Sequence, residues 1–302
     1  MSRIEEALRR ASTQVSAVDA PAPVLRDRLS LALRPLVRIE DYAEEAIGAT
    51  NDQSSQPNDL PQPVKWTQAH AGGDATKPVS TRVARLVSDP ATSRAATNQY
   101  RRLGATLHQT QMQQGLKLIM VASSQPSEGK TLTAVNLALT LSASYQRRVL
   151  LVDADLRQPA VHELFGISNT MGLADALRGN ITAPLHEVSP HITVLPAGQP
   201  DAKSLSALVS ARMETVLNEL VGRFDWVILD TPPVESVPDG QMLAGLVQGV
   251  IFIVAAHKTP YNVVDKAITA VGRERIIGTV LNRTEHGNDA SAKTYGRYDC
   301  VG

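Results

Sequence analysis

From about residue 89 onward, short apolar runs alternate along the chain with stretches whose apolar residues follow helical spacing. Continuous apolar runs are typical of buried parallel strands, whereas apolar residues at i, i+3 and i+4 indicate amphipathic helices. The runs predict strands at about 116–122, 148–153, 191–195, 226–230, 249–255 and 276–282. Their alternation with helices predicts an α/β fold, in which a mostly parallel sheet is covered on both faces.

The part of the chain before these strands has a different pattern. Residues 1–47 are predicted to form an N-terminal helical extension, and residues 48–88 are rich in Asn, Gln, Ser, Gly and Pro and are interpreted as a flexible linker. A helix over residues 2–18 would gather apolar side chains on one face: Ile4, Leu8, Ala11 and Val15. Such a helix could dock on a partner, pack against its own chain or be frayed in solution.

The predicted strands belong to one domain over residues 89–286. It begins with Asp89 and Pro90, a pair that favours the first positions of a helix. Residues 287–302 follow it and lack an apolar run, so we predict a disordered tail that can enter an active site.

Charge and composition narrow the classes of function. The 302 residues include 30 basic and 30 acidic side chains, with zero net charge and a pI near 7.1, which argues against nucleic-acid binding driven by bulk charge. No run reaches the ~18 to 20 apolar residues that span a bilayer, and the amino terminus lacks the apolar core of a signal peptide. The single cysteine, Cys300, cannot form an internal disulfide. These features predict a cytoplasmic protein.

The most specific motif follows the first of these strands. Residues 121–131 read VASSQPSEGKT, and the final Gly-Lys-Thr is typical of a phosphate-binding loop. The backbone N–H groups of such a loop surround phosphate oxygens, and the next helix directs its positive end at them. Ser124 replaces the first glycine of the usual pattern, but the order of strand, loop and helix favours nucleotide binding over a solvent-exposed turn.

Within this motif, Lys130 would neutralise the β- and γ-phosphates and the Thr131 hydroxyl would ligate Mg²⁺. The residues of the loop that we expect to bind the nucleotide are Ser124, Gln125, Pro126, Ser127, Glu128, Gly129, Lys130, Thr131 and Leu132.

Two later strands end in carboxylates. VLLVDADLRQP at 149–159 carries Asp153 and Asp155 at the end of its apolar run, and FDWVILDTPP at 224–233 ends its run at Asp230. Ligands of open α/β sheets bind at the carboxyl ends of the strands, beside the phosphate loop. Asp230 is therefore placed to hold Mg²⁺ through water. A single acid at a strand end could equally be a helix cap or a turn residue, but three motifs in this order favour a nucleotide site.

The stretches SSQPSEGKT, VLLVDADLRQP and VILDTPP resemble the Walker A, Walker A′ and Walker B motifs of the bacterial tyrosine kinases. Further stretches similar to this family are GLADALRGN at 172–180, ITVLPAGQP at 192–200, HKTPYNVVDKAI at 257–268 and GTVLNRTE at 278–285. The resemblance covers about residues 90–286, and the opening MSRIEEALRRA resembles the start of cytoplasmic tyrosine autokinases linked to exopolysaccharide assembly. It implies a three-layer P-loop NTPase fold with the N-terminal extension added.

The resemblance implies transfer of the γ-phosphoryl group of ATP to tyrosine, with ATP and Mg²⁺ as cofactors. Lys130 and the loop amides would stabilise charge on the transferred group, while Thr131, Asp155 and Asp230 would hold the metal. Asp153 would orient or deprotonate the incoming tyrosine, although Asp153 and Asp155 could exchange roles.

Two further residues have two interpretations each. The resemblance places Asn282 against the adenine ring, but Asn282 could instead form a turn at the end of its strand. Arg157 could contact phosphate or fix its own turn by hydrogen bonds to neighbouring residues.

The acceptor residues would lie in the tail, where Tyr295 and Tyr298 are the candidates. Members of the family often carry a longer tyrosine cluster, so phosphorylation at many sites is a weaker expectation for this chain. The alternative is that both are ordinary polar tail residues.

Assembly is a second departure from the family. Its members often have a Glu-x-x-Arg-x-x-Arg helix that closes a ring, in which the tail of one subunit is phosphorylated in trans by the next. Here the matching residues 98–104 read NQYRRLG, so Asn98 replaces the acid and Gly104 replaces the second arginine. The resemblance allows a homo-oligomer with phosphorylation in trans, but the ion pairs of that motif are missing, which argues against the ring. Arg101 and Arg102 could pair with other carboxylates or simply face solvent.

Two classes of function remain. The first is a tyrosine autokinase that regulates exopolysaccharide or capsular polysaccharide synthesis and export. The cytoplasmic segment of a membrane chain-length regulator would activate it and hold it at the inner face of the plasma membrane. The second is a nucleotide-dependent adaptor or positioning ATPase without kinase activity. Partitioning and division-site ATPases have a lysine where this chain has Gln125, and iron-protein relatives need cluster-ligating cysteines, so the kinase interpretation is favoured.

Overall fold

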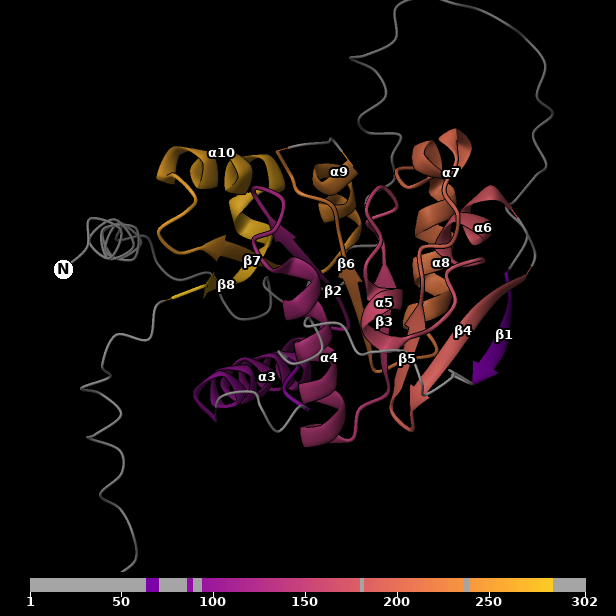
Figure 1. Ribbon diagram of the computed structural model, residues 1–302, viewed down its shortest axis with the longest axis horizontal. Coiled ribbons are helices and arrows are strands. Elements are labelled where there is room, and N and C mark those ends of the chain that lie inside the picture. The colour runs from indigo at the N-terminus through magenta and orange to yellow at the C-terminus, as the bar shows by residue number, and fades with distance from the viewer. Residues whose placement is uncertain (1–63, 71–85, 89–93, 180–181, 236–238, 285–302) are drawn as a thin grey trace, which may run out of the picture.

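The computed structural model describes residues 64–70, 86–88, 94–179, 182–235 and 239–284 (Figure 1). The predicted amino-terminal helix and the tail with Tyr295 and Tyr298 lie outside the described residues, as does the predicted helix start at Asp89 and Pro90. Within the described parts, eight strands form one sheet in the order β1-β4-β5-β3-β6-β2-β7-β8. The strands are β1 Lys65–His70, β2 Leu118–Ser123, β3 Val149–Asp153, β4 Thr182–Ser189, β5 Ile192–Leu195, β6 Trp226–Asp230, β7 Gly249–Ala255 and β8 Ile276–Asn282.

Helices cover both faces of this sheet, which confirms the predicted three-layer α/β architecture (Figure 1). One face packs against α3 Arg94–Gln114, α4 Lys130–Tyr145 and α5 Val161–Phe165. The other face packs against α6 Leu173–Arg178, α7 Ala202–Ala207, α8 Ala211–Val221, α9 Asp239–Leu246 and α10 Tyr261–Val271, and a 3₁₀ turn, η3 Arg273–Arg275, precedes β8.

The central strands explain why both faces need cover. In β2, Leu118, Met120 and Ala122 enter the core beneath the second group of helices, whereas Ile119 and Val121 enter the core beneath α3 and α4. Side chains of a strand alternate between faces, so an unbroken apolar run is buried on both sides.

The strand pairs are parallel except for β4 and β5, which run antiparallel and are joined by a short turn. Six of the eight strands, β2, β3 and β5 to β8, correspond to the six runs predicted from the sequence, with small shifts at their ends. The two strands that were not predicted, β1 and β4, lie together at one edge of the sheet.

Strand β1 lies inside the segment that the composition predicted to be a flexible linker. Residues 65–70 pair in parallel with β4, and Val64, just before the strand, is buried. Glu219 of α8 accepts hydrogen bonds from the Trp66 indole at 3.1 Å and from the Val64 backbone N–H at 3.4 Å. An edge strand buries only part of its surface, so KWTQAH needs no continuous apolar run and resembles a linker in composition.

The predicted linker reaches the core at a second point. Leu86 is buried beside α3 and α4, and the Val87 N–H donates to the Asn136 side chain at 2.8 Å. Residues 86–88 are therefore anchored to α4.

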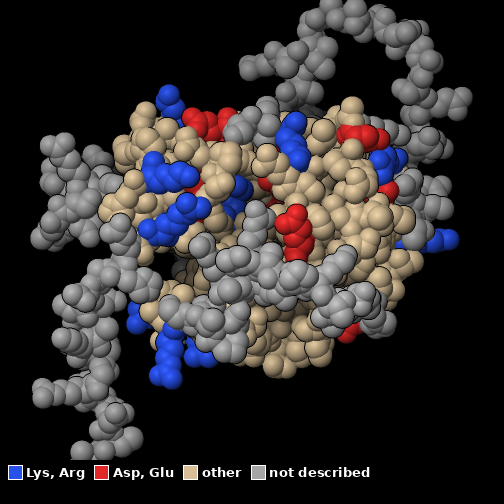
Figure 2. Space-filling model, viewed as in Figure 1, with Lys and Arg blue, Asp and Glu red and all other residues tan. Residues whose placement is uncertain are grey.

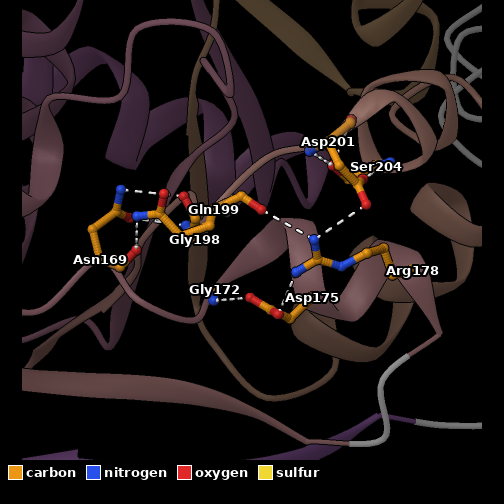
Figure 3. A network of polar contacts seen from close by, with 8 residues as sticks. All are labelled: Asn169, Gly172, Asp175, Arg178, Gly198, Gln199, Asp201 and Ser204. Carbon is orange, nitrogen blue, oxygen red and sulfur yellow. Dashed lines mark hydrogen bonds and ion pairs between the residues drawn. The ribbon is translucent and has the colours of Figure 1, made fainter.

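The helices after β3 and β5 are joined by a network of polar contacts (Figure 3). Arg178 of α6 pairs with Asp175 at 2.5 Å and with Asp201, the residue before α7, at 3.4 Å. Gly198 approaches the segment before α6 so closely that a Cβ atom there would lie 2.7 Å from the Gly172 nitrogen. The network fixes residues 172–178 against the segment that follows β5.

The sheet order determines where the predicted site residues meet. β6 lies between β2 and β3, and Asp153 and Asp230 are paired residues at the ends of β3 and β6. The loop after β2 therefore lies beside both carboxylate-bearing ends, as expected for a ligand site of an open parallel sheet.

Candidate functional site

The phosphate loop joins β2 to α4, and its backbone takes two left-handed conformations. Ser127 has φ 62° and Gly129 has φ 102°. A Cβ atom at position 129 would lie 2.1 Å from Nδ2 of Asn282, so glycine is required there. The first residues of α4, Lys130 and Thr131, follow directly, and the positive end of this helix favours an anion.

A pocket of about 540 Å³ opens beside the loop, a volume in the range typical of small-molecule sites. It is lined by Pro126, Ser127, Gly129, Lys130, Thr131, Leu132, Asp155, Gln158, Pro159, Ala160, Glu163, Leu164, Pro233 and Arg283. The pocket thus brings most of the predicted loop residues together with Asp155. The predicted site residues outside its lining are Ser124, Gln125, Glu128, Asp153, Asp230 and Asn282.

Lys130 lies among the carboxylates of the site. Its side chain is largely buried, and the residue is 7% exposed. The ammonium charge acts to lower the pKa of Asp155 and of Asp230. Lys130 is therefore close enough to balance these acids in the absence of a nucleotide.

Asp153 and Asp230 form a buried pair of acids at the base of the site. Asp153 is 0% exposed and Asp230 is 1% exposed. Burial raises the pKa of Asp230 to about 7. Burial, together with the charge of Asp230, holds the pKa of Asp153 well above its usual range. Two carboxylates so close in a buried setting resist joint ionisation unless a cation accompanies them.

The hydrogen bonds of Asp153 link it to the wall of the pocket. Its Oδ2 accepts from the N–H groups of Ala160 and Val161, at 3.0 and 3.1 Å, where α5 begins. Its Oδ1 is buried without a hydrogen-bond partner among the described residues. Asp153 thus positions the segment before α5 and keeps one oxygen for another group.

Asp155 differs from Asp153 because it reaches the pocket itself. Burial raises its pKa, and a hydrogen bond from the Gln158 N–H at 3.1 Å opposes that shift. Arg157 pairs with Asp239 at the start of α9, at 3.1 Å. Its guanidinium therefore connects the segment after β3 to α9, an arrangement that neither sequence interpretation included.

The carboxylates and hydroxyl of this site fit a magnesium ion. Both oxygens of Asp230 are buried without a partner in hydrogen-bonding geometry among the described residues, although Thr131 is near enough to lower its pKa. No cluster of three or more His, Cys, Asp or Glu in the described ranges has metal-site geometry. Magnesium in nucleotide sites usually takes one or two protein oxygens, water and phosphate, so the observed oxygen donors suit it.

Asn282 and Arg283, at the end of β8, contact the loop from the other side. The Asn282 amide donates to the Glu128 carbonyl at 2.8 Å, and its oxygen accepts from the Arg283 N–H at 2.8 Å. Arg283 donates to the Ser127 carbonyl at 2.5 Å and lines the pocket. Asn282 thus uses one amide N–H and its oxygen in hydrogen bonds within the chain.

Several pocket residues were not predicted from the sequence, among them Gln158, Glu163 and Arg283. Arg283 follows Asn282 directly and has φ 58°, a backbone turn that directs it toward the loop. The motif GTVLNRTE places a charge at this position but gives no indication of the turn. Gln158 and Glu163 line the wall because Asp153 holds the start of α5, which is a tertiary contact.

Basic side chains are concentrated on one part of the molecular surface, although the net charge of the chain is zero. Figure 2 shows Lys and Arg gathered around α10 and β8. The described cations in α10 and in the segments beside α10 and β8 are Lys258, Lys266, Arg273, Arg275 and Arg283, of which Arg273 and Arg275 pair with Asp265 and Glu274. A local basic patch beside the pocket favours the approach of an anionic ligand.

The helix that should carry the assembly motif is α3. Asn98, Arg101 and Arg102 are exposed on it, whereas Gly104 is buried. A Cβ atom at position 104 would lie 3.0 Å from Cγ2 of Thr140 on α4. Position 104 therefore faces α4, and an arginine would not fit there without displacing α4.

Comparisons with known proteins agree with this geometry. The family described as ParA: NUBPL iron-transfer P-loop NTPase matches residues 115–295. Tyrosine-protein kinase YwqD of Bacillus subtilis (strain 168) is 31% identical over 208 residues, which cover 67% of this chain and 87% of the relative. The succinoglycan biosynthesis transport protein ExoP of Rhizobium meliloti (strain 1021) is 29% identical over 56% of this chain, which spans 22% of that protein.

A solved structure shows the same likeness. The kinase domain of Escherichia coli tyrosine kinase ETK has a TM-score of 0.59 and 27% identity, over 66% of this chain and 79% of that one. In the described ranges, no helix is both long and apolar enough to cross a bilayer.

Proposed function

This chain belongs to the bacterial tyrosine kinases, within the ParA-type P-loop NTPases, and we propose that it transfers the γ-phosphoryl group of ATP to tyrosines of its own tail. The process that it serves is the synthesis and export of exopolysaccharide or capsular polysaccharide. The observation that carries the proposal is the meeting of a phosphate loop with three acids, Asp153, Asp155 and Asp230, at adjacent strand ends. The similarity to a tyrosine kinase, which this chain matches over 87% of that protein's length, favours phosphoryl transfer over simple nucleotide binding.

Each residue of the site has a role in the proposed reaction. The loop amides and Lys130 hold the β- and γ-phosphates and neutralise charge on the transferred group. Thr131 and Asp230, assisted by Asp155, would hold Mg²⁺, which supplies positive charge to the phosphate oxygens when bound. Binding the ATP phosphates so near to these acids is electrostatically feasible only with such a cation.

Asp153 is the group that we assign to the tyrosine hydroxyl. Its free Oδ1 and its raised pKa suit a carboxylate that orients or accepts a proton. The exchange of roles between Asp153 and Asp155 remains the alternative, because Asp155 is the acid that lines the pocket.

The proposed acceptors are Tyr295 and Tyr298, phosphorylated in trans within a homo-oligomer. Asn98 and Gly104 cannot supply the ion pairs of the ring motif, so such an assembly would rest on other contacts. The proposed activator is the cytoplasmic segment of a membrane polysaccharide chain-length regulator. Through that partner the kinase would lie peripherally at the inner face of the plasma membrane. Asn282, with Arg283 beside it, would contact the adenine.

Mass spectrometry of the purified protein after incubation with Mg·ATP tests this function, with and without the activating segment. We expect phosphate on Tyr295 or Tyr298 in the wild type and none in Lys130→Met, which lacks the phosphate-neutralising charge. Lys117→Met is the matched control, because Lys117 is an exposed lysine before β2. ATP hydrolysis without phosphotyrosine under either condition would instead support the adaptor ATPase, a function that the kinase relatives do not favour.

A further inference from the structure

Glu128 is a buried carboxylate of the phosphate loop whose side chain has no role in the proposed reaction. It is 1% exposed and directly precedes Gly129 and Lys130. A buried carboxylate is costly unless donors surround it, so its contacts indicate what it holds in place.

The donors to Glu128 come from two different parts of the fold. Its Oε2 accepts from the Gln125 N–H at 2.7 Å, within the loop itself. Its Oε1 accepts from the Ala255 N–H at 3.3 Å and from the Thr259 hydroxyl. Ala255 ends β7, and Thr259 lies in the turn between β7 and α10. One carboxylate therefore closes the loop on itself and fastens it to that turn.

The turn is itself a defined structure. The N–H groups of Lys258 and Thr259 donate to the Ala255 carbonyl, at 3.3 and 3.2 Å, so the Thr259 hydroxyl is held in position relative to Ala255. From the neighbouring strand, Asn282 donates to the backbone carbonyl of Glu128. Residue 128 is thus held by its side chain to β7 and by its backbone to β8.

The same contacts affect the amides that can bind phosphate. The Gln125 N–H donates to Glu128 and not into the loop interior. The remaining loop amides are therefore the ones available to a phosphate, and the contacts of Glu128 hold the backbone that carries them. An anion-binding loop whose amides are already directed loses less freedom when phosphate binds.

We propose that Glu128 and Thr259 are positioning residues that fasten the phosphate loop to the β7–α10 turn and thereby set the affinity for the nucleotide phosphates. This inference rests on the proposed nucleotide site, but binding measurements can test it independently of kinase activity. Neither residue touches the reacting atoms. The effect should therefore be on nucleotide affinity and KM more than on kcat.

Glu128→Gln is a sharp test because glutamine has the same shape. Each carboxylate oxygen of Glu128 accepts from a backbone N–H, of Gln125 on one side and of Ala255 on the other. Whichever way the glutamine amide turns, its NH₂ faces one of these donors. Thr259→Val replaces the hydroxyl with a methyl group, whereas Thr259→Ser keeps the hydroxyl and loses the methyl group.

We would measure Mg·ADP affinity by calorimetry and KM for ATP in autophosphorylation of the full chain. We expect about tenfold weaker binding and a similar rise in KM for Glu128→Gln, with kcat changed by less than about threefold, in line with the loss of one buried hydrogen bond. Thr259→Val should weaken binding several-fold, and Thr259→Ser should bind like the wild type. The double variant should be little weaker than Glu128→Gln, since coupled residues are not additive.

Matched controls are Thr269→Val, a threonine of α10 whose hydroxyl donates to the Asp265 carbonyl of the same helix, and Glu274→Gln, whose side chain is 76% exposed. Wild-type affinity in Glu128→Gln, or additive losses in the double variant, would overturn the proposal while leaving the kinase assignment intact. Wild-type protein that binds no Mg·ADP would contradict the proposed function itself. A lower melting temperature with unchanged affinity would make the contacts structural only, which also overturns the proposal.

Discussion

Asp153 and Asp155 are separated by one residue, yet their surroundings differ enough to distinguish their roles. An asparagine at position 153 can still accept from the Ala160 and Val161 N–H groups through its remaining oxygen. We therefore expect Asp153→Asn to fold normally and to lower kcat by about 10² to 10⁴, the range of a lost general base. Its Mg·ADP affinity should stay within about twofold of the wild type.

Asp155→Asn should give the opposite pattern, since Asp155 lines the pocket beside Lys130. We expect the Mg²⁺ concentration for half-maximal phosphorylation to rise about tenfold, consistent with the loss of an outer metal contact. Magnesium titrations of both variants, with phosphotyrosine as the readout, check this. If Asp153→Asn changed the magnesium requirement and Asp155→Asn did not, the two roles would be exchanged.

Asp230 makes the stability of the nucleotide-free protein depend on pH. Its pKa is about 7 in the folded protein because of burial, against 3.8 for the free group. Between these two pKa values the folded state binds more protons than the unfolded state. The contribution of Asp230 to the free energy of unfolding is therefore greatest below about pH 4 and is lost as the pH rises through 7. The raised pKa of Asp153 acts in the same direction.

We therefore expect the metal-free protein to lose roughly 2 to 4 kcal/mol from this group between pH 5 and 8. Urea unfolding at several pH values should show this slope in the wild type and a flatter one in Asp230→Asn. Adding Mg·ADP should restore stability at pH 8 in the wild type, because a bound cation offsets the buried charge. Equal slopes for the two proteins would show that burial does not raise the pKa of Asp230 in the folded protein.

Residues with a specific local role could be predicted from the sequence, and those defined by tertiary contacts could not. Gly129 and Lys130 were identifiable because the loop needs them at fixed spacing. The ion pair of Arg157 was not, because its partner Asp239 lies far along the chain. The Arg283 side chain reaches the pocket only through the turn after β8. Both depend on how separate segments meet, which no local pattern contains.

At the level of elements, α3 provides a test of the missing assembly motif. Gly104 packs against Thr140 of α4, so restoring the arginine of the family motif would overfill this contact. We expect Gly104→Arg to destabilise the protein by about 1 to 3 kcal/mol, as overpacking usually does. Chemical denaturation measures the loss, with Ala105→Arg at an exposed neighbour as the control.

Asn98→Glu should leave the free energy of unfolding within about 0.5 kcal/mol of the wild type, because the position is exposed.

If Gly104→Arg were as stable as the wild type, α3 would have to move away from α4 to admit the side chain. The fold would then tolerate the family motif, and the absence of the motif would be weaker evidence against ring assembly.

Apolar runs predicted six strands, including the half-exposed edge strand β8, and missed β1 and β4 at the opposite edge. β2, β3, β6 and β7 have almost fully buried side chains, so their sequences are continuous apolar runs. β1 and β4 mix polar and apolar residues, as in KWTQAH and TAPLHEVS. Pairing with a neighbour makes these segments strands, and in β4 only alternate residues such as Ala183 and Leu185 are fully buried.

For the molecule as a whole, β1 makes residues 64–70 part of the folded unit, although their composition resembles a linker. The Trp66 and Val64 contacts with Glu219 connect β1 to α8, and β1 covers the outer edge of β4. The folded unit therefore starts before residue 89, the boundary that helix signals suggested. A kinase domain cut to begin at residue 89 would lack an edge strand.

Two truncations test this boundary. Removing residues 1–60 retains β1 and should leave the melting temperature within about 2 °C and basal phosphorylation unchanged. Removing residues 1–75 takes away the buried Val64 and half-buried Trp66 and leaves β4 as an unprotected edge. The lost burial is worth about 2 to 4 kcal/mol, or roughly 5 to 10 °C in a domain of this size, and an exposed strand edge promotes aggregation.

Thermal unfolding and light scattering of the two truncated proteins measure these effects. Trp66→Ser in the full chain should reproduce part of the loss, whereas Thr67→Ala on the exposed side of the same strand should not. If removal of residues 1–75 changed neither melting nor aggregation, β1 would contribute nothing to stability and the linker interpretation would hold for residues 65–70. If it abolished phosphorylation without lowering the melting temperature, β1 would act on the reaction, which its position at the far edge from β2 does not predict.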